Sequence, residues 1–261
     1  MRIFLIYALL VSSFSCHRPS RQIAAMMTPT RTETPEVADY TRHIRAGNSL
    51  IANGTEPFWS LTINISKNRM TFTTVDGDSI VTKVPERLDD VRGAFRYDAT
   101  AESNRLMARF RPDSCVNAMS GQRFDYAVEV TANGKTYTGC GASLGQLMSL
   151  NDIWVLKTLH GQPVTVSPPQ KELPYIEINL SEGRIGGLAG CNRIMGSVRA
   201  DTRQVDFGRL ATTMMACPGE TAQLENSFLK ALEGPLSYQI ADMTLTLMRD
   251  GKPVATFKKV D

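Results

Sequence analysis

The sequence predicts a mainly β protein of the α+β class, with two small antiparallel β domains and a single packed helix in the second. Three observations favour this class. Short segments alternate apolar and polar residues with period two, turn dipeptides separate them, and one stretch near Leu224 has helical spacing. The length of 261 residues suits two modest domains better than one.

The first residues have the layout of a secretory signal. One arginine precedes an apolar run over residues 3–11, and small residues follow before Cys16. The run is too short to cross a membrane as a helix. The sequence Ser13-Phe14-Ser15-Cys16 resembles a lipobox, where a signal peptidase cuts after lipid is attached. We therefore expect a signal peptide over residues 1–15 and a lipid on Cys16; the alternative is an ordinary signal peptide cleaved nearby.

The cysteine count supports lipidation. An odd number of cysteines in an exported chain leaves one thiol to explain, and acylation of Cys16 accounts for it. Pairing the others in order along the chain keeps each disulfide inside one domain, and an oxidising compartment permits both. A zinc site is the rival interpretation, but no CxxC spacing occurs, so we expect no metal and no cofactor. The five cysteines are Cys16, Cys115, Cys140, Cys191 and Cys217.

Residues 16–50 are predicted to form a lipidated, disordered tether. They mix Pro, Thr, Arg and Glu without sustained periodicity, so they bury too little apolar area to offset the entropy of ordering. The residues after Cys16 are not acidic, which in Gram-negative sorting permits transfer to the outer membrane. We expect an envelope protein held on the outer membrane by its lipid and facing the periplasm.

The first β domain is predicted over residues 51–147. Its clearest hairpin has apolar residues at period two from Phe124 to Val130, followed by Asn133-Gly134, a dipeptide that favours a type I′ turn. That turn would place Val130 opposite Tyr137. A second hairpin is expected around Asp76-Gly77, between residues 69–75 and 80–84.

The second domain is predicted over residues 148–261. Its helix begins near Pro218, which the first helical turn tolerates, and Gly234-Pro235 follows its end. Leu224, Phe228 and Leu232 recur every four residues and form its apolar stripe. The strands are expected over residues 154–159, 175–180, 184–190, 243–248 and 254–258.

Two motifs in this domain carry a family resemblance. They are Gly187-Leu188-Ala189-Gly190-Cys191-Asn192 and Thr212-Thr213-Met214-Met215-Ala216-Cys217. With Gly196 and Glu225 they resemble the META domain of HslJ-type heat-shock proteins. The resemblance implies an antiparallel sheet packed with one helix and an association with envelope stress, antibiotic resistance and secretion, without an established enzymatic activity. Met214 stands where family members commonly carry Arg, so a role of that Arg does not transfer.

Gly190 and Asn192 are the candidate functional residues of this region. A glycine at such a position indicates close strand approach or an unusual backbone conformation, and an asparagine often caps a turn. The alternative is that Asn192 and the backbone amides around it bind a ligand.

The first domain has a signature of its own, Gly54-Thr55-Glu56-Pro57-Phe58-Trp59-Ser60, with Met119-Ser120 and Gly139-Cys140 further on. It resembles an uncharacterised membrane-anchored bacterial lipoprotein domain whose function is unassigned. Glu56 beside Pro57, Phe58 and Trp59 could act as a general acid or base if a second carboxylate were near. The structural interpretation has Phe58 and Trp59 anchoring the first strand in the core and Glu56 capping a turn.

Composition and motifs limit the possible functions. The net charge of +3 is mild and both signs are interspersed, so no nucleic-acid partner is expected. The sequence has no GxSxG elbow, HExxH motif or Walker loop. The leading hypothesis is a non-enzymatic binding or stress-related module that contacts another envelope component. The alternatives are an inhibitor of lysozyme or a protease, and an envelope hydrolase that pairs Glu56 with Asp113 or Asp125.

Overall fold

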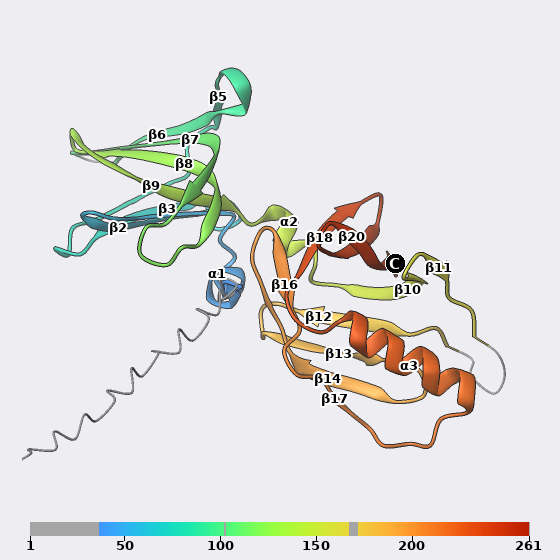
Figure 1. Ribbon diagram of the computed structural model, residues 1–261. Coiled ribbons are helices and arrows are strands. Elements are labelled where there is room, and N and C mark those ends of the chain that lie inside the picture. Colours follow the sequence, from blue (N-terminus) through green and yellow to red (C-terminus); the bar gives the residue numbers. More distant parts are fainter. Residues whose placement is uncertain (1–36, 102, 167–171, 261) are drawn as a thin grey trace, which may run out of the picture. The chain divides into compact units, whose positions relative to one another are not determined.

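A computed structural model describes residues 37–101, 103–166 and 172–260 (Figure 1). They form two antiparallel sheets and three helices, which confirms a mainly β protein of the α+β class. The signal peptide, Cys16 and the first part of the predicted tether lie outside the described residues. Within the described residues, every helix is too short or too polar to span a lipid bilayer.

The first sheet has nine strands in the order β4-β3-β2-β1-β9-β8-β7-β6-β5. It curls until β4 and β6, which are not paired, contact each other. One face therefore turns inward and is filled by aromatic and aliphatic side chains. The strands are β1 (Leu50–Thr55), β2 (Phe58–Asn64), β3 (Arg69–Thr74), β4 (Ser79–Thr82), β5 (Leu88–Asp89), β6 (Phe95–Ala101), β7 (Asn104–Val116), β8 (Arg123–Ala132) and β9 (Lys135–Ser143).

The β8–β9 hairpin forms as the sequence predicts. Asn133 and Gly134 have φ angles of 51° and 81°, the left-handed values that a type I′ turn requires. Val130 pairs with Tyr137 across the two strands, and both are buried. The alternation of apolar residues thus sets the register as well as the face.

The second sheet has eleven strands, ordered β15-β16-β18-β19-β20-β10-β12-β13-β14-β17, with β11 paired to β10 outside this path. The strands are β10 (Ile153–Leu159), β11 (Gln162–Pro163), β12 (Tyr175–Asn179), β13 (Arg184–Leu188), β14 (Arg193–Ser197), β15 (Arg199–Ala200), β16 (Gln204–Asp206), β17 (Ala211–Thr212), β18 (Leu236–Ala241), β19 (Thr244–Arg249) and β20 (Lys252–Lys259).

A kink at Val198 closes this second sheet. Val198 alone separates β14, which pairs with β13, from β15, which pairs with β16 at the opposite end of the order. One end of the strand order, β15, is therefore joined covalently to β14 near the other end, because β14 and β15 are consecutive segments on either side of Val198. Val198 is buried, and its backbone N–H donates to the carbonyl of Gly183 at 3.0 Å. The sheet forms a barrel, and the side chains that it encloses belong to one hydrophobic core cluster.

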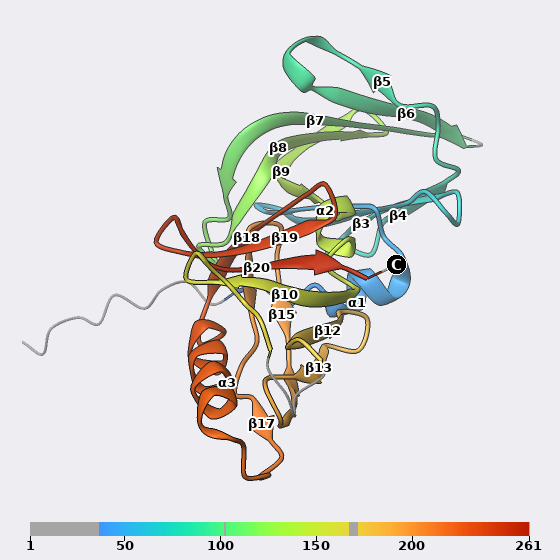
Figure 2. The same cartoon turned by 90° about the vertical axis from the view of Figure 1, so that its right-hand side faces the viewer.

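Helix α3 (Gly219–Ala231) confirms the predicted helix, with Pro218 at its N-cap. It lies along the second sheet near β17 (Figures 1 and 2). Phe228 and Leu232 are buried, and the ring of Phe228 lies 6.0 Å from that of Phe257 on β20. The apolar stripe of the sequence is thus the packed face of the helix.

The end of the predicted tether is corrected by the structure. Residues 41–46 form helix α1 (Thr41–Ala46), and Val37 and Tyr40 are 4% and 7% exposed. Tyr40 joins the cluster that contains Phe124 and the core of the second sheet. Two anchoring side chains order this segment although it has no periodic pattern, which is why sequence periodicity missed it.

Both predicted disulfides form, linking Cys115 with Cys140 and Cys191 with Cys217. The first joins the far end of β7 to β9, and the second joins the turn before β14 to the segment before α3. Between the sheets the chain passes through the short helix α2 (Gly145–Met148), and a 3₁₀ turn spans Val91–Gly93 in the first sheet.

Candidate functional site

Asn192 is the centre of the most densely bonded polar cluster in the second sheet. It is 5% exposed and lies between β13 and β14. Its amide nitrogen Nδ2 donates to Glu225 Oε1 at 2.8 Å, and its backbone N–H donates to Glu225 Oε2 at 2.9 Å. Its Oδ1 accepts from the Thr213 hydroxyl at 2.9 Å and from the Met215 N–H at 2.8 Å. One side chain therefore ties together a turn, a loop and a helix.

Gly190 allows the helix to approach this turn. A Cβ at Gly190 would lie 2.9 Å from Glu225 Cβ and 3.1 Å from the carbonyl oxygen of Thr221. The site excludes a side chain because α3 occupies that space. Gly190 is thus explained by the close approach of α3, and Asn192 by the hydrogen bonds of its side chain and backbone.

Glu225 is the residue that the sequence analysis underestimated. It is 8% exposed and lies on the packed face of α3, at helical spacing from Thr221 and Phe228. A carboxylate in an apolar stripe was the available signal, because buried charges need fixed partners. Asn192 supplies those partners to both of its oxygens.

Trp59 organises the signature of the first sheet. It is 4% exposed, and its indole N–H donates to the carbonyl of Thr138 at 3.1 Å. A Cβ at Gly54 would lie 2.1 Å from the indole nitrogen, and one at Gly139 would lie 2.8 Å from indole Cζ2. Two glycines on neighbouring strands therefore make room for one ring.

The other signature residues lie outside the core. The Glu56–Pro57 peptide is cis and forms the turn between β1 and β2, where Glu56 and Pro57 are exposed. Phe58 is 49% exposed, so its predicted role as a core anchor is wrong, whereas Trp59 fills that role. On β2 the two residues alternate, and Phe58 falls on the outer face.

The structure does not bring Glu56 together with Asp113 or Asp125. Through β9, the pairing register places Asp125 level with Ile51. Glu56 lies five residues further along, a separation of about 16 Å of extended strand. Asp113 lies beyond β8, one strand further across the sheet. Asp125 is instead ion-paired with Arg203 at 3.1 Å. The strand register therefore holds both aspartates too far from Glu56 to form a glycosidase carboxylate pair with it.

A rigid turn follows β7 in the first sheet. Asn117 Oδ1 accepts from the N–H groups of Met119 and Ser120 at 3.0 and 3.1 Å. Asn117 Nδ2 donates to the side chain of Asn53 at 3.1 Å. Met119 is 70% exposed at the tip. The turn therefore presents an apolar side chain to solvent on a fixed backbone.

A crevice of about 660 Å³ lies beside α1 and includes Tyr40, Gln122 and His43. Burial, and then the negative charges of Asp201 and Asp125, raise the pKa of Tyr40 well above its usual range. Tyr40 is therefore a neutral phenol at physiological pH, hydrogen-bonded to Gln122.

His43 in the same crevice has a lowered pKa, caused first by burial and then by the charge of Arg42. Arg42 Nε donates to His43 Nε2 at 3.3 Å, and Asn48 Nδ2 lies 3.2 Å from Nδ1. Both ring nitrogens are thus in contact with neighbours in the same segment. The arrangement orients the imidazole within α1 and its continuation rather than toward a nucleophile.

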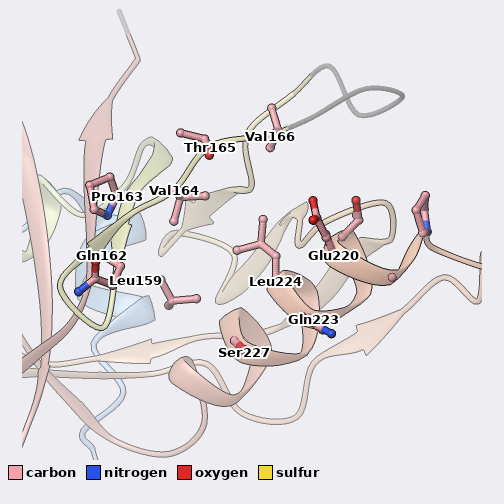
Figure 3. Close-up of a pocket in the computed structure, with 13 residues that line it drawn as sticks. Leu159, Gln162, Pro163, Val164, Thr165, Val166, Glu220, Gln223, Leu224 and Ser227 are labelled. Carbon is pink, nitrogen blue, oxygen red and sulfur yellow. The ribbon is translucent and has the colours of Figure 1, made fainter.

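A groove of about 650 Å³ separates α3 from the segment that runs through and beyond β11 (Figure 3). Leu224 points from the helix toward the segment that carries Val164, and Leu159 adds to the apolar surface. Its polar side chains are those of Gln162, Thr165, Glu220, Thr221, Gln223 and Ser227.

The chemistry of this groove suits binding. Of its thirteen lining residues, all within the described chain, Glu220 is the only ionisable one. A lining of apolar and polar side chains, with one charge among the described residues, suits the binding of a ligand or a partner segment.

Residues 146–261 match a family model described as the META domain. Two solved NMR structures also resemble the chain. One, described only as the structure of a protein, is 25% identical with a TM-score of 0.35, and the match covers 42% of this chain and 89% of that one. The other, a protein from Burkholderia xenovorans, is 30% identical with a TM-score of 0.35, covering 43% and 85%. No curated protein matches the chain.

The packing around Trp59 predicts a large effect of Gly139→Ala. The new Cβ would lie 2.1 Å from the backbone oxygen of Asn53, which cannot move without breaking the sheet. We expect the free energy of unfolding to fall by about 3 kcal/mol in denaturant titrations. The control is Gly145→Ala in α2, where the nearest atom is 3.9 Å away. Equal unfolding midpoints for the two variants would contradict this account of the signature.

The Asn192 cluster predicts strong coupling between Asn192 and Glu225. Asn192→Ala removes a donor from a buried carboxylate, so we expect a loss of about 3 kcal/mol in the free energy of unfolding. In a double-mutant cycle, Asn192→Ala and Glu225→Ala should together cost clearly less than their sum. Asn226→Ala, on the exposed face of α3, serves as control and should change stability by less than about 0.5 kcal/mol. Strict additivity would show that the two residues act separately.

Proposed function

Because residues 146–261 match the META domain model, we propose that the chain is a non-catalytic binding module of the bacterial cell envelope. The observation that carries this proposal is the groove beside α3, whose described lining residues combine an apolar floor with one ionisable side chain, that of Glu220. Trp59 and Asn192, the buried residues of the two signatures, hold the fold through their hydrogen bonds. The groove instead offers exposed side chains for recognition, among them Gln223 and Ser227.

The chemistry of the groove suggests the kind of partner. Leu159, Val164 and Leu224 form a floor that favours an apolar side chain, and Glu220 favours a basic one. Strand β11 pairs with β10 along one edge. An extended segment of an envelope protein could lie between β11 and the helix. Such a partner would use backbone hydrogen bonds for affinity and its side chains for specificity.

The envelope location of this proposal rests on sequence features. The lipobox-like Ser13-Phe14-Ser15-Cys16 supports a lipid anchor at Cys16 in the outer membrane, facing the periplasm. The two disulfides are consistent with an oxidising compartment. A lipid anchor would confine the groove to the layer next to the membrane, where envelope partners are concentrated.

Inhibition of an exogenous lysozyme or protease is a second candidate function, and the turn at Asn117 favours it. Inhibitors commonly present a rigid exposed loop to an enzyme cleft, because a fixed loop loses little entropy on binding. Asn117 fixes the backbone of this turn, and Met119 is exposed at its tip.

The groove hypothesis predicts site-specific crosslinking in cells. A photo-crosslinking amino acid at Gln223 should trap one discrete envelope protein. The same residue at Asn226, exposed on α3 but outside the groove, should not. Adding Ser227→Arg should lower the yield at Gln223 by about tenfold, a loss of about 1.4 kcal/mol in binding. Identical products at Gln223 and Asn226 would argue against the groove.

The inhibitor hypothesis predicts a stoichiometric loss of enzyme activity when the purified chain is titrated into lysozyme or a protease. Met119→Arg should abolish that loss, because it replaces the apolar tip of the turn. Met195→Arg is the matched control, since Met195 is 59% exposed on the second sheet. Full enzyme activity at a large excess of the unmodified chain would exclude this function.

A further inference from the structure

The second disulfide and one carboxylate form a group of three potential metal ligands, the two disulfide sulfurs and an oxygen of Glu225. Cys191 follows β13, Cys217 precedes α3, and Glu225 lies on the packed face of that helix. Their two sulfur atoms and one carboxylate oxygen all lie within 4.8 Å of one another. The two cysteines are half-buried and the glutamate is buried, so solvent can reach the cluster from the sulfur side.

We propose that reduction of the Cys191–Cys217 disulfide converts this cluster into a site for one zinc-like divalent cation. The two sulfurs and the Glu225 carboxylate would supply three ligands, and water would complete a tetrahedron on the half-buried side. The disulfide and the metal would then be alternative links between the turn before β14 and α3. The inference is independent of the groove.

The distances fit this conversion. Zinc takes sulfur at about 2.3 Å and carboxylate oxygen at about 2.0 Å, so a tetrahedral site separates sulfur from oxygen by about 3.5 Å. Cys217 Sγ already lies 3.7 Å from Glu225 Oε2. The two sulfurs must move apart to about 3.8 Å, which is a shift within the reach of side-chain rotation. The carboxylate can stay where it is.

Asn192 holds the carboxylate in place for this role. It donates to one oxygen of Glu225 through its backbone and to the other through its side chain. Its Nδ2 also lies 3.2 Å from Cys217 Sγ. Outer hydrogen bonds of this kind orient metal ligands and contribute strongly to affinity. Asn192 therefore already orients two of the three ligands, Glu225 and Cys217.

Charge favours a cation after reduction. The disulfide is neutral, whereas two metal-binding thiolates beside a buried carboxylate place three negative charges in one cluster. A divalent cation offsets most of that charge, and mixed sulfur and oxygen ligands suit zinc among the common biological metals.

The redox step is balanced with a dithiol as reductant. The dithiol gives up two electrons and two protons and becomes a disulfide, while the Cys191–Cys217 bond breaks to give two thiols. Metal binding then forms two metal–sulfur bonds and one metal–oxygen bond and releases the two thiol protons.

Cobalt(II) titration of the full chain carrying Cys16→Ser tests the proposal, because cobalt reports thiolate ligands by charge-transfer absorption. After anaerobic reduction we expect one cobalt per chain with sulfur-to-metal absorption, displaced by zinc. The oxidised chain should give none, and neither should the reduced Cys191→Ser/Cys217→Ser variant, which retains Cys115 and Cys140.

The variant Glu225→Gln tests whether the carboxylate of Glu225 binds the metal. It keeps one of the two oxygen acceptors for Asn192 and removes the charge, so cobalt affinity should fall by at least about tenfold. Glu220→Gln, in the exposed first turn of the same helix, should leave affinity unchanged.

Near-ultraviolet circular dichroism controls for folding during the titration. If reduction loosens the second sheet, zinc should restore the spectrum of the unmodified chain and fail to restore that of the double serine variant. The proposal is overturned if the reduced chain gives no thiolate absorption and no zinc-dependent recovery. It is equally overturned if absorption persists without Cys191 and Cys217.

Discussion

The contact between Asn192 and Glu225 is the constraint on which the second sheet depends. Glu225 is 8% exposed on the packed face of α3, and a buried carboxylate is costly unless its oxygens have donors. Asn192 provides one donor to each oxygen. The same side chain accepts from Thr213 and Met215, so it fixes the loop that leads to α3. The helix, in turn, closes over the barrel core through Phe228. A polar bond thus determines where an apolar face packs.

In the first sheet the main constraint is steric, because the large side chain of Trp59 must fit against neighbouring backbone. Trp59 needs room next to the β1–β9 pairing, and Gly54 and Gly139 provide it by lacking side chains. The indole N–H is then satisfied by the carbonyl of Thr138. The glycines of this signature make room for the Trp59 indole, and the carbonyl of Thr138 accepts its N–H. The signature thus has a structural explanation.

Local patterns in the sequence predict the parts of this fold that local forces determine. The turn at Asn133-Gly134, the register of Val130 and the helix after Pro218 all follow from period and turn chemistry. Long-range features do not. The kink at Val198 closes a barrel through strands distant in sequence, and no local pattern marks it. The sequence predicted both Phe58 and Trp59 in the core, but neighbouring residues on a strand point to opposite faces, so Trp59 is inside and Phe58 is outside.

The same distinction explains why the candidate sites were harder to predict than the fold. Residues such as Gly190 and Trp59 stand out in the sequence because the packing of the backbone or the core requires them. Their side chains or their lack of one already serve the fold. Residues that remain available for recognition, such as Gln223 and Ser227, are ordinary surface side chains. They come together with Gln162 only because α3 and the segment through β11 line the same groove. Recognition by such a surface is a property of the assembled fold, so the groove becomes visible only after the barrel and its helix are in place.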